Sequence, residues 1–211
     1  MIDTKIFSKT DLTDETLKQI AVLLENQNVV AFPTETVYGL GAHVFKEEAI
    51  EKIYTLKNRD RKKSLIVHIS KIEDVKKVAR DIPDAFYILA QKFFPGPLTI
   101  ILKKKDTIPS IVSESSTIAV RMPNNIYTLK LIELLKEPIV GTSANISNAK
   151  NPISAKDVLD TFMGKIDAII DSGICPIKVP STIISLVDSY KILRQGSISK
   201  DQIDSVLKAI K

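Results

Sequence analysis

Short apolar runs alternate with longer amphipathic stretches along the chain. The short runs are rich in β-branched residues and are often bounded by proline or glycine, a pattern that predicts strands. We expect these strands at 5–8, 29–32, 64–69, 98–103, 117–122, 139–141, 168–171, 182–187 and 191–194.

The longer stretches carry apolar residues at helical spacing. In the first, Ile20, Leu23 and Leu24 share one face, and Thr13 precedes it as an N-cap. The last repeats this design behind Ser199. The predicted helices are 14–26, 47–56, 71–79, 83–94, 125–136, 155–163 and 200–210.

This alternation predicts an α/β fold. The runs 98–103 and 117–122 follow one another without a helix, as do 182–187 and 191–194, so each pair can be antiparallel and we expect a mixed sheet. A chain of 211 residues suits one well-buried domain. The prediction is therefore a single domain, 1–211, with a twisted mixed parallel and antiparallel sheet and flanking helices.

The composition indicates in which cellular compartment the protein is expected and which partners its charge favours. No apolar run reaches the length of a membrane span, and the start MIDTKIFSK lacks the apolar core of a signal peptide. The single Cys175 excludes an intramolecular disulfide, and there are only two histidines. We therefore expect a cytoplasmic protein with no membrane partner. The net charge of +5 favours anionic partners such as nucleotides or RNA, although a lysine-rich surface explains it equally well.

Several common nucleotide and hydrolase motifs are missing. The chain has no G-x-x-x-x-G-K-[ST] phosphate loop and no G-x-S-x-G nucleophile elbow. Gly39-Leu40-Gly41, which we interpret as a turn, has Val44 where a dinucleotide fingerprint needs a third glycine. If the protein binds a nucleotide, it must do so through a different sequence motif.

Two stretches of the sequence contain candidate functional residues. In PTETVY, 33–38, hydroxyls, a carboxylate and a phenol directly follow an apolar strand, either as turn chemistry or as the floor of a site. In LKNRDRKKSLIVHIS, 56–70, five cations precede a strand. On an extended backbone Lys57, Arg59, Arg61 and Lys63 would point to one side and could clamp a polyphosphate, or the stretch could be a solvated loop.

Two further segments add candidates. Arg121 lies in an otherwise apolar strand, where it needs an internal carboxylate or a ligand carboxylate as partner. In IVGTSANISN, 139–148, Gly141, Ser143 and Asn145 lie on one side if the backbone is extended, although TSAN by itself is typical of a loop or helix cap. His68 faces away from the apolar side of its strand.

Taken in order, these segments resemble the YrdC-like family, the threonylcarbamoyl-AMP synthases. The resemblance runs from about residue 10 to residue 200. The matching motifs are PTETVYGLGA at 33–42, KNR at 57–59, SLIVHI at 64–69, FPGPLTIIL at 94–102, IAVRMP at 118–123, GTSANIS at 141–147, STIISL at 181–186 and ILRQGSIS at 192–199.

The resemblance implies a sheet around a basic concave cavity and a short form without an extra C-terminal domain. It implies an enzyme that makes threonylcarbamoyl-adenylate and pyrophosphate from L-threonine, bicarbonate and ATP. Mg²⁺ would arrive with ATP, and no metal held by the protein is expected. The product would pass to a transferase complex that modifies adenosine 37 of tRNA.

The resemblance also implies residue roles. The family's tetrad at the triphosphate corresponds to Lys57, Arg59, Ser143 and Asn145. Its further ATP contacts correspond to Lys63, Thr117, Asn151 and Arg194. Its threonine contacts correspond to Thr36, His68, Arg121, Gly141 and Ser181. Thr34 and Tyr38 would join Thr36 in the cavity floor, and Glu35 stays open between a structural cap and a contact.

Two alternatives remain. One is a non-catalytic module that binds tRNA or double-stranded RNA, and the other is a paralogue that makes another carbamoyl-adenylate. For the synthase, we expect Lys57→Ala and Arg59→Ala to abolish turnover without harming the fold, because both residues precede a strand rather than fill the core.

Overall fold

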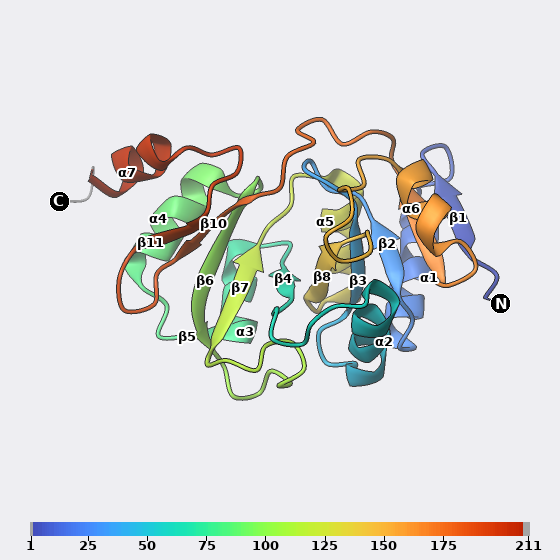
Figure 1. Cartoon of the computed structure of the whole chain (residues 1–211), viewed down its shortest axis with the longest axis horizontal. Coiled ribbons are helices and arrows are strands. Elements are labelled where there is room, and N and C mark those ends of the chain that lie inside the picture. Colours follow the sequence, from blue (N-terminus) through green and yellow to red (C-terminus); the bar gives the residue numbers. More distant parts are fainter. Residues whose placement is uncertain (1, 209–211) are drawn as a thin grey trace.

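An eleven-stranded mixed sheet runs through the protein (Figure 1). The computed structural model describes residues 2–208. The strand order is β1-β9-β2-β3-β8-β4-β7-β6-β10-β11, and β5 pairs with β6. The strands are β1 (Lys5–Ser8), β2 (Val30–Phe32), β3 (Gly39–His43), β4 (Ile66–His68), β5 (Ala79–Arg80), β6 (Leu98–Lys104), β7 (Thr117–Arg121), β8 (Ile139–Ser143), β9 (Ala168–Asp171), β10 (Thr182–Ser185) and β11 (Lys191–Arg194).

The predicted mixture of strand directions is confirmed. Strands β6 and β7 are antiparallel, and so are β10 and β11. Parallel pairing joins β1 to β9, β4 to β7 and β6 to β10. Parallel neighbours need long crossovers, which the helices supply.

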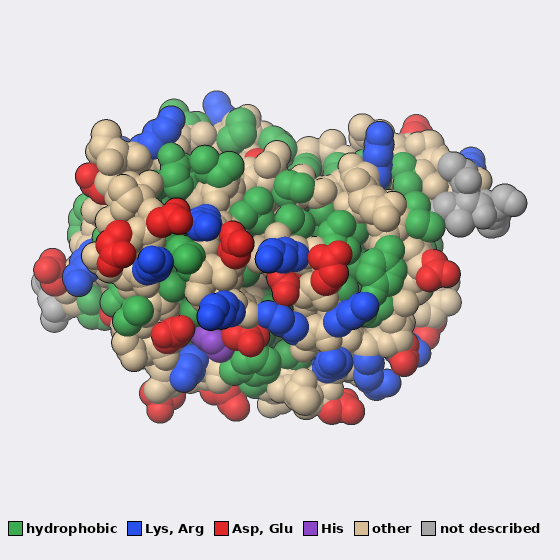
Figure 2. Space-filling model, turned by 180° about the vertical axis from the view of Figure 1, so that it is seen from behind, with side chains coloured by type: hydrophobic (Ala, Val, Ile, Leu, Met, Phe, Trp, Pro, Cys, Tyr) green, Lys and Arg blue, Asp and Glu red, His purple; other side chains and the backbone are tan. Residues whose placement is uncertain are grey.

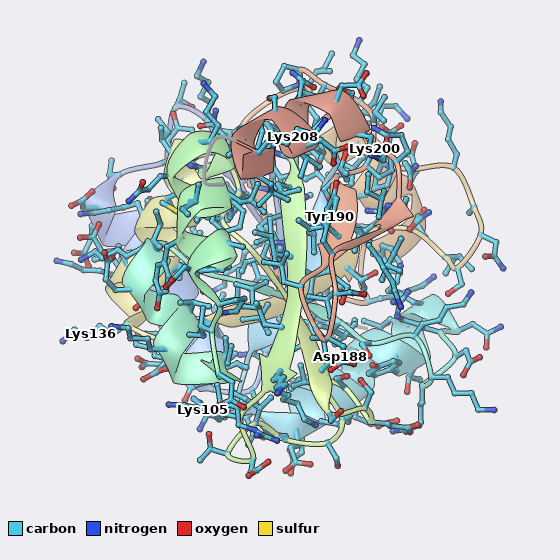
Figure 3. The ribbon with its side chains drawn as sticks, turned by 90° about the vertical axis from the view of Figure 1, so that its left-hand side faces the viewer. Lys105, Lys136, Asp188, Tyr190, Lys200 and Lys208 are labelled. Atoms are coloured by element: carbon cyan, nitrogen blue, oxygen red, sulfur yellow. The ribbon has the colours of Figure 1, made fainter. Side chains whose placement is uncertain are left out.

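Helices cover the sheet from both sides. One core packs α1 and α5 against one side of β2, β8 and β9, and the other core contains α2, α4 and α6. Figure 3 shows α7 beside α4, with Lys200 at its start and Tyr190 of the β10–β11 connection beneath it. The helices are α1 (Asp14–Glu25), α2 (Glu47–Lys57), α3 (Val75–Val78), α4 (Asp84–Phe93), α5 (Ile126–Leu135), α6 (Ala155–Phe162) and α7 (Lys200–Lys208).

Local signals explain most helix starts. The Thr13 side chain accepts a hydrogen bond from the Thr16 backbone, as its position predicted, and Asn125 and Ser154 cap α5 and α6 in the same way.

Most predicted elements agree with the structure to within two residues. No helix of residues 2–208 is long and apolar enough to cross a membrane. The predicted end of the last helix, 209–210, lies outside the described residues.

Three local predictions were wrong. The Gly39-Leu40-Gly41 stretch is not a turn but part of β3, paired with β2 and β8. The predicted helix 71–79 divides into a 3₁₀ turn (Ile72–Asp74), α3 and the short β5. The cations after position 56 do not form an extended row, because α2 continues to Lys57 and Asn58 closes it in the left-handed conformation.

The glycines of β3 and β8 leave room for one aromatic ring. A Cβ atom at Gly39 or Gly41 would lie 2.6 Å from the Phe32 ring, and one at Gly141 would lie 2.9 Å from it. The ring therefore lies flat over strands that have no side chains there. Its other neighbour is His68, in an edge-to-face contact with centroids 5.2 Å apart.

A long connection, 172–181, carries the chain from β9 across to β10, past the edge of the intervening strands (Figure 1). Its backbone is tied down on the way. Cys175 donates its N–H to Ile153, and Ile177 donates its N–H to the Glu35 carbonyl. The connection delivers Ser181 to the middle of the molecule.

We expect Gly41→Ala to lower the free energy of unfolding by about 1–3 kcal/mol, because the added methyl overlaps the Phe32 ring in a packed core. Chemical denaturation would measure the change. Combining it with Phe32→Leu should recover part of the loss, since the smaller side chain vacates that space. Strictly additive effects of the two substitutions would contradict this contact.

Candidate functional site

A cavity of about 290 Å³ opens over the middle strands. Its walls come from the loop after β2, from β3, β4, β7 and β8, and from β10 with Arg194 at the end of β11. The Phe32 ring forms part of its floor. Thr34, Thr36 and Tyr38 also line it, so their predicted place in the floor is confirmed.

Strand register gives the cavity a direction. His68 pairs with Arg121 on one side and with Ile139 on the other, and two residues along, Ile66 pairs with Gly141. Strand β8 then continues to Ser143. At about 3.3 Å per residue, Ser143 lies about 13 Å along the strands from the His68–Arg121 level. The cavity therefore has two chemically different ends.

The first end is built around Arg121. Its side chain is 5% exposed and its Nη2 atom lies 2.9 Å from Oε1 of Glu35, whose side chain is also 5% exposed. Nη2 also donates to Thr36 Oγ1 at 2.8 Å, and Nε donates to the Gly96 carbonyl at 3.4 Å. The internal carboxylate considered as a partner for Arg121 is therefore Glu35.

A turn holds the threonines of this end in place. The Thr34 hydroxyl accepts hydrogen bonds from the backbone N–H groups of Thr36 and Val37. Its oxygen also lies 2.9 Å from the Thr36 hydroxyl. Tyr38 donates its hydroxyl to the Gly173 carbonyl at 2.7 Å, and burial raises the pKa of this phenol. The stretch is therefore a hydrogen-bonded turn whose residues also line the cavity.

His68 is buried beside Arg121. Its Nδ1 atom has no hydrogen-bond partner among the described residues. Burial, with a smaller contribution from the Arg121 charge, lowers the pKa of His68 to about 3. The imidazole is neutral at physiological pH, so it can accept or donate a hydrogen bond but does not add a charge.

A hydroxyl relay fixes Arg194 in the wall. Arg194 donates from Nε to the Ser181 carbonyl at 3.1 Å and from Nη2 to the Ser181 hydroxyl at 3.2 Å. That hydroxyl lies 2.8 Å from Oγ1 of Thr99, which is fully buried. The guanidinium is thus held by β6 and the start of β10.

The second end combines Arg59 and Ser143. Arg59 donates to the carbonyls of Lys63 and Ser64, at 3.0 and 2.9 Å, which curls the loop after α2 around its guanidinium. Burial lowers the pKa of Arg59 from its ordinary value. Ser143 and Asn151 line the same region of the cavity.

Lys57 lies behind this end rather than in it. It is 1% exposed, and its Nζ atom donates to the carbonyls of Ser143 and Asn145, both at 2.5 Å, and to Asn145 Oδ1 at 3.3 Å. Burial, together with the Arg59 charge, lowers the pKa of Lys57 to about 7. The expectation that Lys57 lies outside the core was therefore wrong, and Lys57→Ala would leave buried carbonyls without their donor.

Asn145 completes this internal network. Its Oδ1 also accepts the Ser143 hydroxyl at 2.7 Å, while its Nδ2 donates to the carbonyls of Ala149 and Lys150. The loop after β8 is therefore closed by its own amide. Each polar atom of the Asn145 side chain is used within the protein.

Most of the predicted site residues come together. Those that line the cavity are Thr36, Arg59, His68, Arg121, Gly141, Ser143, Asn151, Ser181 and Arg194. Lys57, Asn145, Lys63 and Thr117 do not line it. Lys63 contributes its carbonyl to Arg59 while its residue is exposed, and Thr117 lies at the start of β7, hydrogen-bonded to Ser115.

Sequence reasoning missed the apolar part of the lining. Phe32 and Gly39 lie in the floor, and Pro180 and Ile183 lie in the wall near Ser181. Alternating glycines in an apolar run, GLGA, were a usable signal, because a strand without side chains on one face must receive a bulky neighbour.

The charges of the cavity have one sign. The charged side chains in its lining are Arg59, Arg121 and Arg194. The pKa of Arg194 is lowered by burial and by Arg121. Within residues 2–208, no group of three or more His, Cys, Asp or Glu side chains is placed to hold a metal ion.

Fold and cavity together define an α/β protein whose mixed sheet carries a polar, arginine-lined cavity over its middle strands. Residues 22–196 match the family of Sua5, YciO and YrdC, described as "Telomere recombination". The chain belongs to this family.

Individual relatives agree with this assignment. Threonylcarbamoyl-AMP synthase of Pyrococcus abyssi is 42% identical over 193 residues, which cover 90% of this chain and 57% of that protein. A relative from Methanocaldococcus jannaschii is 35% identical, with 93% of this chain and 95% of the relative covered. The crystal structure of P. abyssi Sua5 complexed with L-threonine superposes with a TM-score of 0.92 at 39% identity, covering 97% of this chain and 60% of that one. The chain thus spans little more than half the length of the Pyrococcus protein.

We expect His68 to stay neutral between about pH 5 and pH 8, because burial disfavours its charged form. NMR titration of the imidazole signals, assigned with His68→Asn, would measure this. The unfolded chain binds a proton below about pH 6.5 that the folded chain refuses until about pH 3. The free energy of unfolding should therefore fall as pH falls through this window, less steeply in His68→Asn. A midpoint near 6.5 for His68 would contradict the prediction.

Proposed function

We propose that this protein is a threonylcarbamoyl-AMP synthase that combines L-threonine, bicarbonate and ATP. The observation that carries the proposal is the cavity lined by two arginines at different levels of the sheet: Arg121 pairs with His68 in the strand register, whereas Arg59 donates to the carbonyl of Ser64, four residues earlier in the chain. Membership of a family with relatives named threonylcarbamoyl-AMP synthase supports the same activity.

The Arg121 end suits an amino acid. The guanidinium would receive the threonine carboxylate through the N–H groups of Nη1, because Nε and Nη2 already donate within the protein. Thr36, His68 and Ser181 supply neutral hydrogen-bonding groups around it, and the Gly141 backbone allows close approach. Neutral partners suit the threonine hydroxyl and its amine better than further cations would.

The Arg59 end suits the phosphates. Arg59 would contact them directly, and Arg194 and Asn151 also line the cavity. The Ser143 hydroxyl would contact a phosphate oxygen by turning its proton away from Asn145 Oδ1, to which it donates in this structure. Lys57 and Asn145 act differently in this proposal, because their donors are spent on the loop after β8. They hold Ser143 in place. Lys63 and Thr117 would reach ATP only where it extends beyond the described cavity.

The chemistry depends on position more than on a catalytic base. The threonine amine attacks the bicarbonate carbon, a C–N bond forms, and water leaves to give a carbamate. A carbamate oxygen then attacks the α-phosphorus of ATP, and the bond to pyrophosphate breaks. Positioning and charge neutralisation dominate such transfers. The arginines that line the cavity would provide both, and exclusion of water on substrate binding would protect the reactive product.

Mg²⁺ would enter as part of the ATP substrate. The cavity lining contains no carboxylate among residues 2–208, and carboxylate oxygens are the usual protein ligands for this ion. The residues present therefore do not fit a protein-held Mg²⁺ site. In this proposal the protein acts in the cytoplasm, and its product passes to a transferase complex that modifies adenosine 37 of tRNA.

An RNA-binding module is the second candidate. Figure 2 shows cations and anions intermingled over the face opposite to that of Figure 1, rather than one continuous basic field. Of the cavity arginines, Arg121 is buried, Arg59 is half-buried and Arg194 is exposed, and all three are hydrogen-bonded to the protein. A buried cation such as Arg121 can meet a small anionic ligand but not a nucleic-acid backbone.

We expect the purified protein to release pyrophosphate from ATP and Mg²⁺ only when threonine and bicarbonate are both present, because the carbamate is the attacking group. A coupled pyrophosphate assay with each component omitted in turn would measure this. Release that ignores threonine would point to another acceptor. No release under any condition, with salt-sensitive tRNA binding, would favour the RNA-binding module.

We expect Arg59→Ala to reduce kcat/KM by about 100-fold, the usual loss when one charged donor is removed from a transferring phosphate. Lys62→Ala is the matched control, since Lys62 is an exposed cation in the same loop that does not line the cavity. Steady-state kinetics and thermal unfolding would be compared for both. Near-normal activity of a folded Arg59→Ala variant would overturn the placement of the phosphates.

A further inference from the structure

Glu35 is a buried residue that contacts two other segments, the end of β7 with the loop after it and the connection between β9 and β10. Its Oε1 faces Arg121 at the end of β7, and its Oε2 accepts the backbone N–H of Asn124 at 3.0 Å. Its own carbonyl accepts the N–H of Ile177 from the connection between β9 and β10. The Glu35 side chain is 5% exposed and does not line the cavity.

The ion pair between Glu35 and Arg121 brings two buried charges of opposite sign together. A carboxylate or a guanidinium removed from water costs several kcal/mol unless it is paired and hydrogen-bonded. Here each charge is the ion-pair partner of the other, while the hydrogen bond to the carboxylate is made at Oε2 and not at Oε1. The Asn124 N–H fixes the second oxygen of Glu35, so the carboxylate cannot rotate away from Arg121.

The consequence for Arg121 is a fixed orientation. Its Nη2 donates to the Thr36 hydroxyl and lies 2.9 Å from Glu35 Oε1 as an ion pair, and its Nε donates to the Gly96 carbonyl. Its Nη1 makes no hydrogen bond to any other residue in the described part of the chain. Since Arg121 lines the cavity, Nη1 is the nitrogen left for a ligand.

We propose that Glu35 is a positioning residue that sets the angle at which Arg121 meets the carboxylate of the amino-acid substrate. This inference rests on the proposed function, because it requires a carboxylate at the Arg121 end. Glu35 acts through Arg121 without touching the substrate. Its length, which brings the carboxylate to 2.9 Å from Nη2, matters more than its charge.

Two substitutions separate length from charge. Glu35→Asp keeps the charge but withdraws the carboxylate by one methylene, which frees the guanidinium to rotate. Glu35→Gln keeps the length and an oxygen acceptor but removes the charge. Glu51→Asp is the matched control, since Glu51 forms an ion pair with Arg61 on the surface, away from the cavity.

Threonine binding by calorimetry is the measurement, with L-threoninamide as the analogue that lacks the carboxylate. We expect Glu35→Asp to weaken threonine binding by about tenfold or more, as a misplaced contact does, and to leave threoninamide binding unchanged. Glu35→Gln should stay within about threefold of the wild type. ATP binding and the Glu51→Asp control should not change.

The results distinguish failure of the proposed function from failure of the positioning role of Glu35. If the wild type binds no threonine, the proposed function fails. If it binds threonine and Glu35→Asp binds as tightly, the positioning role is overturned. A Glu35→Gln variant that loses affinity while Glu35→Asp keeps it would assign Glu35 to charge compensation instead. If Glu35→Gln does not fold, the charge-conserving Glu35→Asp variant still decides the question.

Discussion

The contact between the Phe32 ring and the glycines of β3 and β8 is the constraint on which the cavity depends. Three neighbouring positions in two strands carry no side chain, and one ring covers them. The floor is therefore flat and close to the sheet, so a ligand can lie along the strands between the Arg121 level and Ser143. Side chains at these positions would fill the space that the site requires. The ring also fixes His68 through an edge-to-face contact, which links the floor to the first end of the site.

The cations around this floor are anchored mainly by main-chain oxygens. Arg59, Arg194 and Lys57 each donate to backbone carbonyls, whereas Arg121 has a carboxylate partner. A carbonyl dipole fixes a cation without cancelling its charge. The first kind of anchoring thus leaves the charge of the cation uncompensated, and the second offsets it with the Glu35 carboxylate. Charges that are already held in place need not reorganise when an anion binds.

Much of the fold was predictable because its elements have strong local signals, such as the cap at Thr13 and the β-branched runs of the middle strands. Strand β3 was not, because GLGAH has low strand propensity and is stabilised by its neighbours on both sides. The residues of the candidate site were likewise predictable only in part. Side chains such as Arg121 could be identified by their unusual surroundings, but the burial of Lys57 could not, since it depends on where the distant loop after β8 returns.

The connection between β9 and β10 has a consequence for the order of assembly. Ser181 and Arg194, which form one wall, follow Thr36 and Arg121 of the other walls at a long distance along the chain. Contacts between such distant segments form slowly, because the intervening chain must first be ordered. A nascent chain that has reached β9 already contains the floor but lacks its second wall. The cavity is therefore complete only after β10 has left the ribosome and joined β6, so chains that end before β10 lack one wall of it.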